Sequence, residues 1–305
     1  MSKRIVLIAG PTASGKSKLA IEIAKKIKGE IINADSMQVY KDFSVLSSRP
    51  SRVDLKKIKH HLYGFISSKK YFSTGAWLTL AKKQIKLCLK RKKIPILVGG
   101  TGLYFESVTK GLSKIPNIDF KLRNRVRVLQ KKLGQKKFYK KLLEIDSLAQ
   151  NKIESFDIQR SIRAYEVKKF TKKSLFKWHE LTKSDFQEFE IFKIFLDPPR
   201  ETILKNISRR TKKMFKNNCI AEVKNFIKLK VDPTFSTNKI IGVKEIKEYL
   251  EKRLDLNQAI ELINIKTRQY AKRQVTWSRG HMVDWKREYS NSFSELSKNI
   301  LKLLS

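Results

Sequence analysis

The sequence predicts an α/β fold in which helices flank a parallel sheet. Short apolar runs that end in glycine or small polar residues alternate with longer amphipathic stretches, as buried strands alternate with helices. Elements that alternate in this way form a parallel sheet with helices on both faces. The 305 residues, of which 41% are hydrophobic, are enough to bury such a core without disulfides.

The individual elements follow from these runs. The predicted strands are rich in isoleucine, leucine and valine, and they cover residues 4–9, 30–34, 94–98 and 190–196. The predicted helices repeat apolar residues at helical spacing, and they cover about residues 16–28, 75–91, 200–230 and 256–278.

The middle of the chain differs from its flanks. Between Asp119 and Lys173 no run has the character of a strand, and the helical patterns are dense in lysine and arginine. We interpret this region as a mainly helical insertion at residues 113–189, within a catalytic core formed by residues 1–112 and 190–305.

The charge of the whole chain is strongly positive. Lysine and arginine number 68 and aspartate and glutamate 28, which gives a formal net charge of +40. Such a charge attracts polyanions, and each phosphate that is neutralised releases counterions. Part of the lysine excess reflects a composition rich in Lys, Ile, Asn and Phe, as an AT-rich genome would encode. Nucleic acid is still the expected partner.

Several protein classes are disfavoured. The two cysteines, Cys88 and Cys219, and the four histidines form no metal-ligand pattern. A cysteine content this low is typical of proteins of a reducing cytoplasm. The N-terminus shows no signal-peptide pattern, and no apolar run is long enough to span a membrane. We expect a cytoplasmic protein that acts as a monomer and does not bind a membrane.

A phosphate-binding loop follows the first predicted strand and opens a helix. The motif G-x-x-x-x-G-K-[ST] in this context is a P-loop, so the predicted fold is P-loop NTPase-like. Its backbone N–H groups and the helix N-terminus face phosphate oxygens. Lys16 neutralises phosphate charge and the Ser17 hydroxyl can ligate Mg²⁺. The motif consists of Gly10, Pro11, Thr12, Ala13, Ser14, Gly15, Lys16 and Ser17.

Polar residues follow two further strands. Asp35-Ser36 comes after the second predicted strand and Gly99-Gly100-Thr101-Gly102 after the third. The carboxyl ends of parallel strands face the ligand crevice, so Asp35 is well placed as a base there. Each segment alone also fits a capped turn. No acidic residue ends the third strand, which weakens the interpretation as an ATPase.

Two basic segments have the residues that contact nucleic acids. Arg160 and Arg163 lie on one face of a predicted helix that Asp157 caps. Residues 272–279 (KRQVTWSR) combine charged donors with an indole that can stack on a base. A solvated helix face would look similar in either case.

Taken together, the motifs resemble those of the bacterial tRNA dimethylallyltransferases (tRNA isopentenyltransferases). The resemblance runs from Gly10 to about Arg279. The most specific segments are GGTGLYF and KRQ-x-TW in this order behind a P-loop. The matching segments are residues 10–17 (GPTASGKS), 32–42 (INADSMQVYKD), 60–62 (HHL), 97–105 (LVGGTGLYF), 157–167 (DIQRSIRAYEV) and 272–280 (KRQVTWSRG).

The resemblance implies roles for these residues. The P-loop and Arg210 hold the diphosphate of dimethylallyl diphosphate. Asp35 is the base on the exocyclic amine of the adenine just 3′ of the anticodon, and Thr101 assists beside it. The insertion binds the anticodon stem-loop while the target base is flipped out. The implied tRNA contacts are Asp35, Ser36, Met37, Gln38, Thr101, Arg123, Gln159, Arg160, Ser161, Ile162, Arg163, Lys272, Arg273, Gln274, Val275, Thr276, Trp277, Ser278 and Arg279.

Three segments depart from the family pattern. The usual G-T-A-K-P is Leu46-Ser47-Ser48-Arg49-Pro50 here, I-G-Y-[KR] is Ile241-Gly242-Val243-Lys244, and a glycine expected after Met214 is Asn218. These departures concern finer tRNA contacts and leave the P-loop and Asp35 assignments intact. No C-terminal zinc-finger pattern is present.

Three alternatives are weighed against this interpretation. A nucleotide or nucleoside kinase would use the same loop for ATP, but the segments at 97–105 and 272–277 argue against it. A non-catalytic RNA-binding protein would not need both Asp35 and Thr101. A prenyltransferase acting on free adenine nucleotides would not need the basic insertion.

Overall fold

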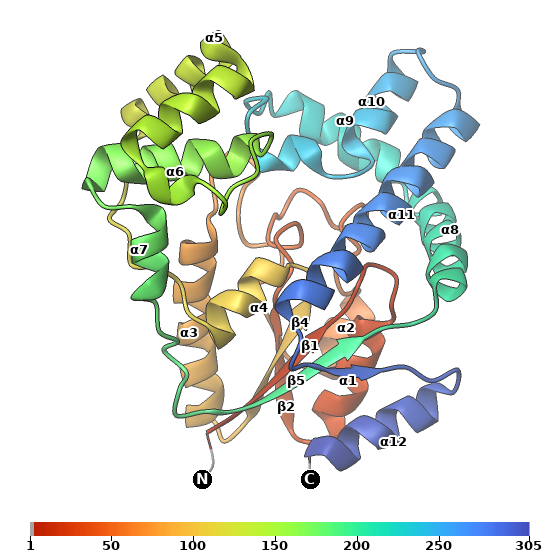
Figure 1. Cartoon of the computed structure of the whole chain (residues 1–305). Coiled ribbons are helices and arrows are strands. Elements are labelled where there is room, and N and C mark those ends of the chain that lie inside the picture. The colour runs from red at the N-terminus through yellow and green to blue at the C-terminus, as the bar shows by residue number, and fades with distance from the viewer. Residues whose placement is uncertain (1–2, 305) are drawn as a thin grey trace. The chain divides into compact units, whose positions relative to one another are not determined.

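The computed structural model describes residues 3–304 and divides the chain into two compact units. The first unit consists of Met1–Ser107 and Phe186–Ser305, and the second is Val108–Asp185 (Figure 1). The second unit begins and ends a few residues before the insertion expected at residues 113–189.

The first unit is built on one parallel sheet of six strands in the order β3-β2-β4-β1-β5-β6. This confirms the predicted parallel sheet flanked by helices. Four strands match the apolar runs, whereas β3 and β6 were not predicted because they are short, polar edge strands. The strands are β1 (Arg4–Ala9), β2 (Gly29–Asn33), β3 (His60–His61), β4 (Ile94–Gly99), β5 (Glu190–Leu196) and β6 (Lys286–Glu288).

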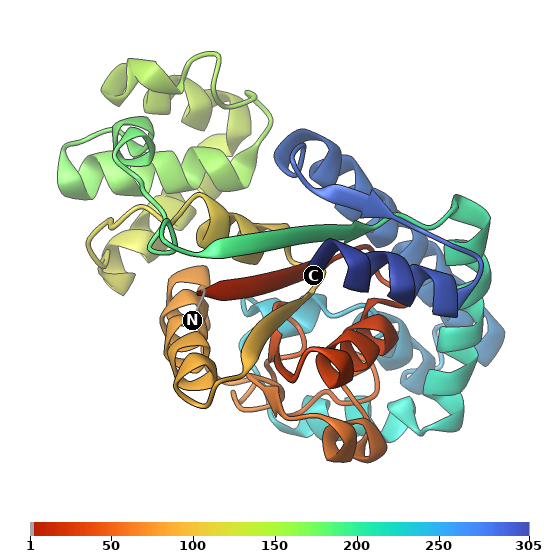
Figure 2. The ribbon, with the colours of Figure 1, turned by 90° about the horizontal axis from the view of Figure 1, so that it is seen from below.

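The core of this unit lies on both faces of the sheet. Val6, Ile31 and Ile96 form one apolar cluster with residues of α1 (Lys16–Lys26) and α12 (Phe293–Leu304). Figure 2 shows α12 beside α1. The next residues along the strands, such as Ile32 and Leu97, are fully buried on the opposite face because side chains alternate along a strand.

The remaining helices surround the carboxyl ends of the strands or connect them (Figure 1). The stretch predicted as one helix at residues 200–230 is two, because Asn218 adopts a left-handed conformation (φ 62°) that asparagine tolerates. The helices are α2 (Arg52–Lys57), α3 (Thr74–Lys90), α4 (Gly102–Thr109), α8 (Arg200–Lys216), α9 (Cys219–Lys228), α10 (Val243–Leu250) and α11 (Leu256–His281).

The second unit is helical, with α5 (Phe120–Ile145), α6 (Ile158–Thr171) and α7 (Leu175–Glu180) around its own apolar core. Gly134 interrupts α5 with a non-helical backbone (φ 72°, ψ 162°). The two ends of the unit are tied together, since the Ser184 hydroxyl donates to the Val108 carbonyl at 2.5 Å.

Among residues 3–304, no helix has both the length and the apolar character needed to cross a membrane.

Candidate active site

The P-loop lies between β1 and α1, as its motif predicts. Ala13 and Gly15 both have left-handed backbones, with φ of 66° and 89°, which curl the chain into a loop. Ala13 also packs against Ile207 of α8 and Ala271 of α11, and its carbonyl accepts a hydrogen bond from Asn206. Two helices from the C-terminal half of the chain therefore fix the loop.

Arg210 reaches this loop from α8, one turn beyond Ile207. Its guanidinium donates to the Thr12 hydroxyl and, at 3.4 Å, to the Leu46 carbonyl. Within the described part of the chain, the buried Arg210 Nε and the buried Ser14 hydroxyl have no hydrogen-bond partner. Buried polar groups are rarely left unsatisfied. These two donors fit a site for an anionic ligand with several acceptor oxygens.

Lys16 is the first residue of α1, and its ammonium donates to the Pro11 carbonyl of the loop at 3.1 Å. Burial lowers its pKa to about 8, Asp35 opposes this effect, and Arg210 adds to it. Burial also lowers the pKa of Arg210, again opposed by Asp35. Two desolvated cations therefore share a site with one carboxylate, and an incoming diphosphate would satisfy both.

The ends of β2 and β4 meet beside the loop, where the sequence predicts a base and a hydroxyl. The Ser36 N–H donates to the Thr101 hydroxyl at 2.9 Å, and that hydroxyl donates to Ser36 Oγ at 3.2 Å. The Asp35 carboxylate accepts from the Met37 N–H at 2.9 Å. The two strand ends approach so closely that a Cβ on Gly99 would lie 1.9 Å from the Ala34 carbonyl oxygen.

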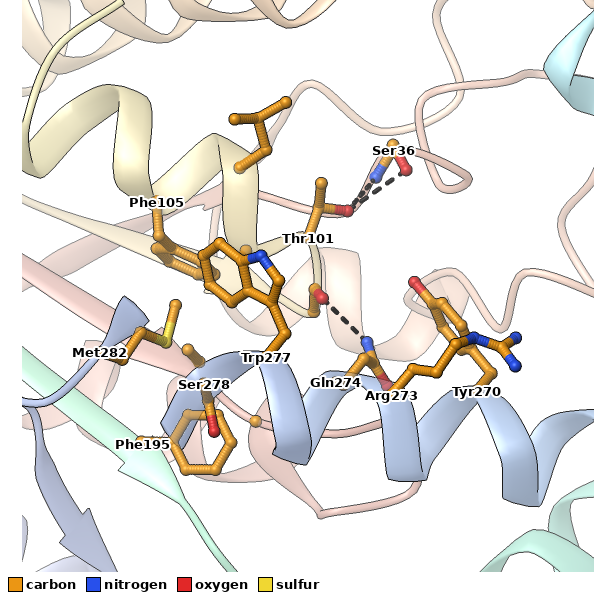
Figure 3. Close-up of a pocket in the computed structure, with 15 residues that line it drawn as sticks. Ser36, Thr101, Phe105, Phe195, Tyr270, Arg273, Gln274, Trp277, Ser278 and Met282 are labelled. Carbon is orange, nitrogen blue, oxygen red and sulfur yellow. Dashed lines mark hydrogen bonds between the residues drawn. The ribbon is translucent and has the colours of Figure 1, made fainter. Parts of the chain in front are cut away.

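A cavity of about 230 Å³ opens beside Thr101. Gly10 of the P-loop and Ser36 also line it, so it adjoins both the phosphate loop and the strand ends. Much of its wall is apolar, with Phe105 and Trp277 close to Thr101 (Figure 3). The site therefore has a charged part around Lys16 and an apolar part that could hold a small hydrocarbon.

Helix α11 forms one wall of this cavity. Tyr270, Gln274 and Trp277 recur at helical spacing and line it together (Figure 3). Tyr270 was not among the residues predicted from the sequence, although its spacing from Gln274 and Trp277 places it on the same helix face. Burial and the nearby Asp35 raise the pKa of Tyr270.

Gln274, one of the predicted tRNA contacts, makes two hydrogen bonds within the protein. Its Oε1 accepts from the Thr12 N–H at 2.8 Å, and its Nε2 donates to the Gly100 carbonyl at 2.8 Å. The side chain thus bridges the P-loop and the end of β4. Ser278 is also turned inward, because it is fully buried. The exposed residues of this segment are Lys272, Arg273, Thr276 and Arg279.

The segment at residues 35–38 is hydrogen-bonded to a neighbouring loop of the same unit. The Gln38 amide donates to the Ser47 carbonyl at 2.9 Å and thereby holds the loop that departs from the family pattern. Glu222 of α9 holds the same loop by accepting hydrogen bonds from the N–H groups of Val45 at 2.8 Å and Leu46 at 2.9 Å. The Leu46–Pro50 departure is therefore stabilised within the first unit.

In the second unit, α5 and α6 bring two of the predicted tRNA contacts together. Arg123 and Arg163 lie near the buried Glu166. Burial raises the pKa of Glu166, and the two arginines only partly oppose this shift. Gln159 and Arg160 are exposed at the start of α6. Ser161 and Ile162 face the core of the unit, so their side chains are not available to RNA in this structure.

Comparisons with known proteins identify relatives of the chain. A family model for IPP transferase matches residues 38–281. A tRNA dimethylallyltransferase from Pelagibacter ubique is 52% identical over 98% of this chain and 97% of its own length. One from Rickettsia canadensis is 44% identical over 92% of this chain and 87% of its own.

Solved structures give the same result. A tRNA isopentenylpyrophosphate transferase from Bacillus halodurans superposes with a TM-score of 0.71 at 29% identity, covering 99% of this chain and 96% of that one. A eukaryotic dimethylallyltransferase acting on tRNA gives 0.79 at 28% identity, covering 91% and 70%. The family match over most of the chain and the close bacterial relatives lead to one conclusion: the chain belongs to the IPP transferase family, the tRNA dimethylallyltransferases.

Proposed function

We propose that this protein transfers the dimethylallyl group of dimethylallyl diphosphate to the exocyclic amine of the adenine 3′-adjacent to the anticodon in tRNA. The observation that carries the proposal is the arrangement of three features in one unit. A cationic phosphate loop near Asp35, an apolar cavity and the hydrogen-bonded strand ends at Ser36 and Thr101 adjoin one another. A prenyl diphosphate has a matching charged end and apolar end.

The donor diphosphate is held by the P-loop, Lys16 and Arg210. The unpartnered Ser14 hydroxyl and Arg210 Nε supply further hydrogen bonds to its oxygens. Charged donors aimed at a leaving group stabilise the charge that develops on it, an effect of several kcal/mol in other enzymes. The dimethylallyl chain lies in the cavity against Phe105 and Trp277.

Transfer exchanges one bond for another. The bond between the allylic carbon and the diphosphate oxygen breaks, and a bond forms between that carbon and the adenine nitrogen. The diphosphate leaves with the bonding electron pair, and the Asp35 carboxylate takes the proton that the amine loses. Thr101, beside Asp35, orients the amine.

Mg²⁺ is the proposed cofactor. The Ser17 hydroxyl, exposed at the start of α1, would ligate it as in other P-loops. The donor set fits, because the loop is rich in hydroxyls and its ligand supplies phosphate oxygens. Bound Mg²⁺ would neutralise charge on the diphosphate.

The acceptor is proposed to be the anticodon stem-loop of tRNA. The exposed cations at residues 272–279 and on α5 and α6 support this proposal through their charge and exposure. The P-loop, base and cavity all belong to one unit of one chain. We therefore propose that the protein works as a monomer, in the cytoplasm where tRNA is modified.

The test compares acceptors and donors directly. The purified protein is incubated with labelled dimethylallyl diphosphate, Mg²⁺ and an anticodon stem-loop with an unpaired adenine 3′ of the anticodon. We expect transfer to this RNA and none when guanine replaces that adenine. Equal labelling of AMP would favour an adenylate prenyltransferase, and phosphorylation of a nucleotide from ATP would favour a kinase.

A further inference from the structure

Residues His60–Leu62 are one of the segments that resemble the family, but they do not line the cavity or belong to the proposed donor site. His60 and His61 form β3, which pairs with Ile31 and Ile32 of β2. The following Leu62 has a left-handed backbone with φ 61°. This conformation is costly for a residue with a branched side chain, so the surrounding structure must impose it.

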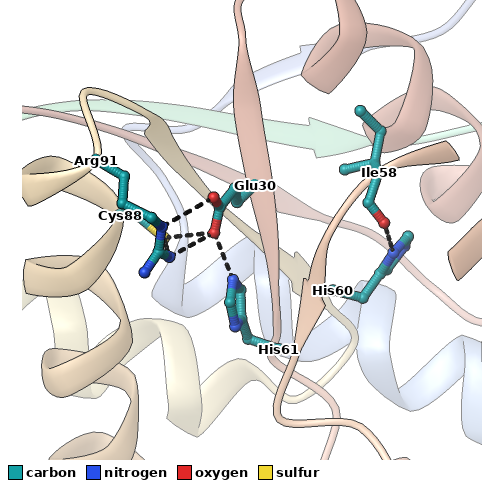
Figure 4. Close-up of polar contacts among 6 residues, drawn as sticks. All are labelled: Glu30, Ile58, His60, His61, Cys88 and Arg91. Atoms are coloured by element: carbon teal, nitrogen blue, oxygen red, sulfur yellow. Dashed lines mark hydrogen bonds and ion pairs between the residues drawn. The ribbon is translucent and has the colours of Figure 1, made fainter. Parts of the chain in front are cut away.

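An ion-pair cluster holds β3 against β2 (Figure 4). His61 Nε2 lies 2.6 Å from Glu30 Oε2, and Arg91 Nη2 donates to the same oxygen at 2.7 Å. Burial raises the pKa of Glu30, but the hydrogen bonds from Arg91 and His61 outweigh it and lower the value to about 2. The carboxylate therefore stays charged and keeps both partners.

The same cluster includes Cys88, so three metal-ligand types lie together. The Cys88 pKa is raised to about 12, chiefly by burial, so the thiol stays protonated. Arg91 already balances the charge of Glu30 with two N–H groups. These observations favour a structural ion-pair cluster over a metal site.

Asn33, the last residue of β2, connects the segment held by this cluster to Asp35. Its side chain is fully buried and bonds to three backbone groups. Nδ2 donates to the carbonyl of Asp35 at 2.9 Å and of Leu62 at 3.0 Å, and Oδ1 accepts from the Asp35 N–H at 2.9 Å. One amide thus holds both backbone groups of Asp35.

We propose that Asn33, braced by the His60–Leu62 segment, is a positioning residue for the Asp35 carboxylate. The backbone of Asp35 lies beyond the sheet ladder, where strand pairing no longer fixes it. Asn33 replaces that pairing, and the left-handed turn at Leu62 presents the carbonyl that orients the amide. This inference rests on the proposed role of Asp35 as the base.

The first test is the kinetics of Asn33→Ala. A small misplacement of a catalytic group costs about 10²-fold in rate, so we expect kcat to fall by that order. The KM values for donor and stem-loop should change by less than about threefold, because neither ligand contacts this buried amide. Wild-type kcat in a folded Asn33→Ala protein would overturn the inference.

A double-mutant cycle separates positioning from a general loss of structure. If Asn33 acts through the Asp35 carboxylate, Asn33→Ala should cause no further loss of kcat in an Asp35→Asn background. If the loss of kcat in the double variant equals the product of the two single losses, the inference is contradicted. Ile96→Val, a core truncation on another strand, is the matched control and should lower the melting temperature without lowering kcat.

Three further outcomes have different consequences. If Asn33→Ala does not fold, Asn33→Ser takes its place, because its hydroxyl is too short to reach both partners, and the same loss of kcat is expected. If the wild-type protein transfers no dimethylallyl group at all, the proposed function fails. If the wild type is active and the Asn33 variants match it, only this inference fails.

Discussion

At the scale of single residues, the site depends on one carboxylate among cations. Asp35 opposes the loss of charge on both Lys16 and Arg210, whose pKa values burial lowers. Its own carboxylate accepts the Met37 N–H at 2.9 Å. The carboxylate is thus held by its own turn and lies near two cations, which suits the proposed base next to a leaving diphosphate.

Replacing Asp35 by asparagine tests its role as the base. Asp35→Asn keeps the shape and the hydrogen bond from Met37 but removes the basic oxygen. A general base contributes about 10²–10⁴-fold, so we expect kcat to fall within that range. Single-turnover assays with saturating donor measure it, and the affinity for the stem-loop is the control. Near-normal turnover would exclude this role.

The pKa of Lys16 predicts how donor use depends on pH. With a pKa lowered to about 8, its ammonium is present below pH 8 and lost as the pH rises above it. The diphosphate needs that charge, so kcat/KM for the donor should fall to half of its maximum near pH 8. Lys16→Met should give a low value without this step. A wild-type profile that stays level to pH 9.5 would be inconsistent with the assignment.

At the scale of elements, the contact between α4 and α11 sets the width of the cavity. Trp277 lies so close to Gly102 that a Cβ there would be 2.1 Å from its ring. Gln274 similarly lies over Gly100. The glycines after β4 are therefore needed because α11 packs directly on this turn.

Gly102→Ala should displace the Trp277 ring and lower both stability and activity. Overpacking of this kind costs about 1–3 kcal/mol. Gly280→Ala is the matched control, since the same helix α11 has open space at that position. It should raise stability slightly through helix propensity. Thermal unfolding and kcat of both variants check this, and equal behaviour of the two would refute it.

The elements also show what could be predicted from the sequence. Apolar runs marked β1, β2, β4 and β5 because these strands are buried, and the P-loop was predicted by its spacing. The edge strand β3 is two polar residues long and has no such signal. The break at Asn218 was missed, although two consecutive asparagines stand there and asparagine has low helix propensity and commonly adopts the left-handed conformation at a helix end. The internal bonds of Gln274 depend on tertiary packing, which spacing alone does not encode.

At the scale of the whole molecule, the formal charge of +40 predicts strongly salt-dependent RNA binding. Each phosphate contact adds about −0.9 to the slope of log K against log salt on duplex nucleic acid. A triple change of the exposed Lys136, Lys137 and Lys140 to Gln should make the slope less steep.

The matched control for this prediction carries the same charge change in the other unit. Lys25, Lys26 and Lys298 are exposed on α1 and α12, and changing them to Gln should leave the slope unchanged. Donor binding should be unaffected in both triple variants. Equal slopes for the wild type and the α5 variant between low and physiological salt would show that α5 does not contact phosphates.

The tie between Ser184 and Val108 has an evolutionary consequence. The first and last residues of the second unit are neighbours in space. The number of residues between them therefore does not affect the path of the chain through the sheet. Helices could be lengthened, shortened or exchanged there at little cost to the unit that carries Asp35 and the P-loop. Lineages could thus change which RNAs they read while inheriting the same prenyl chemistry.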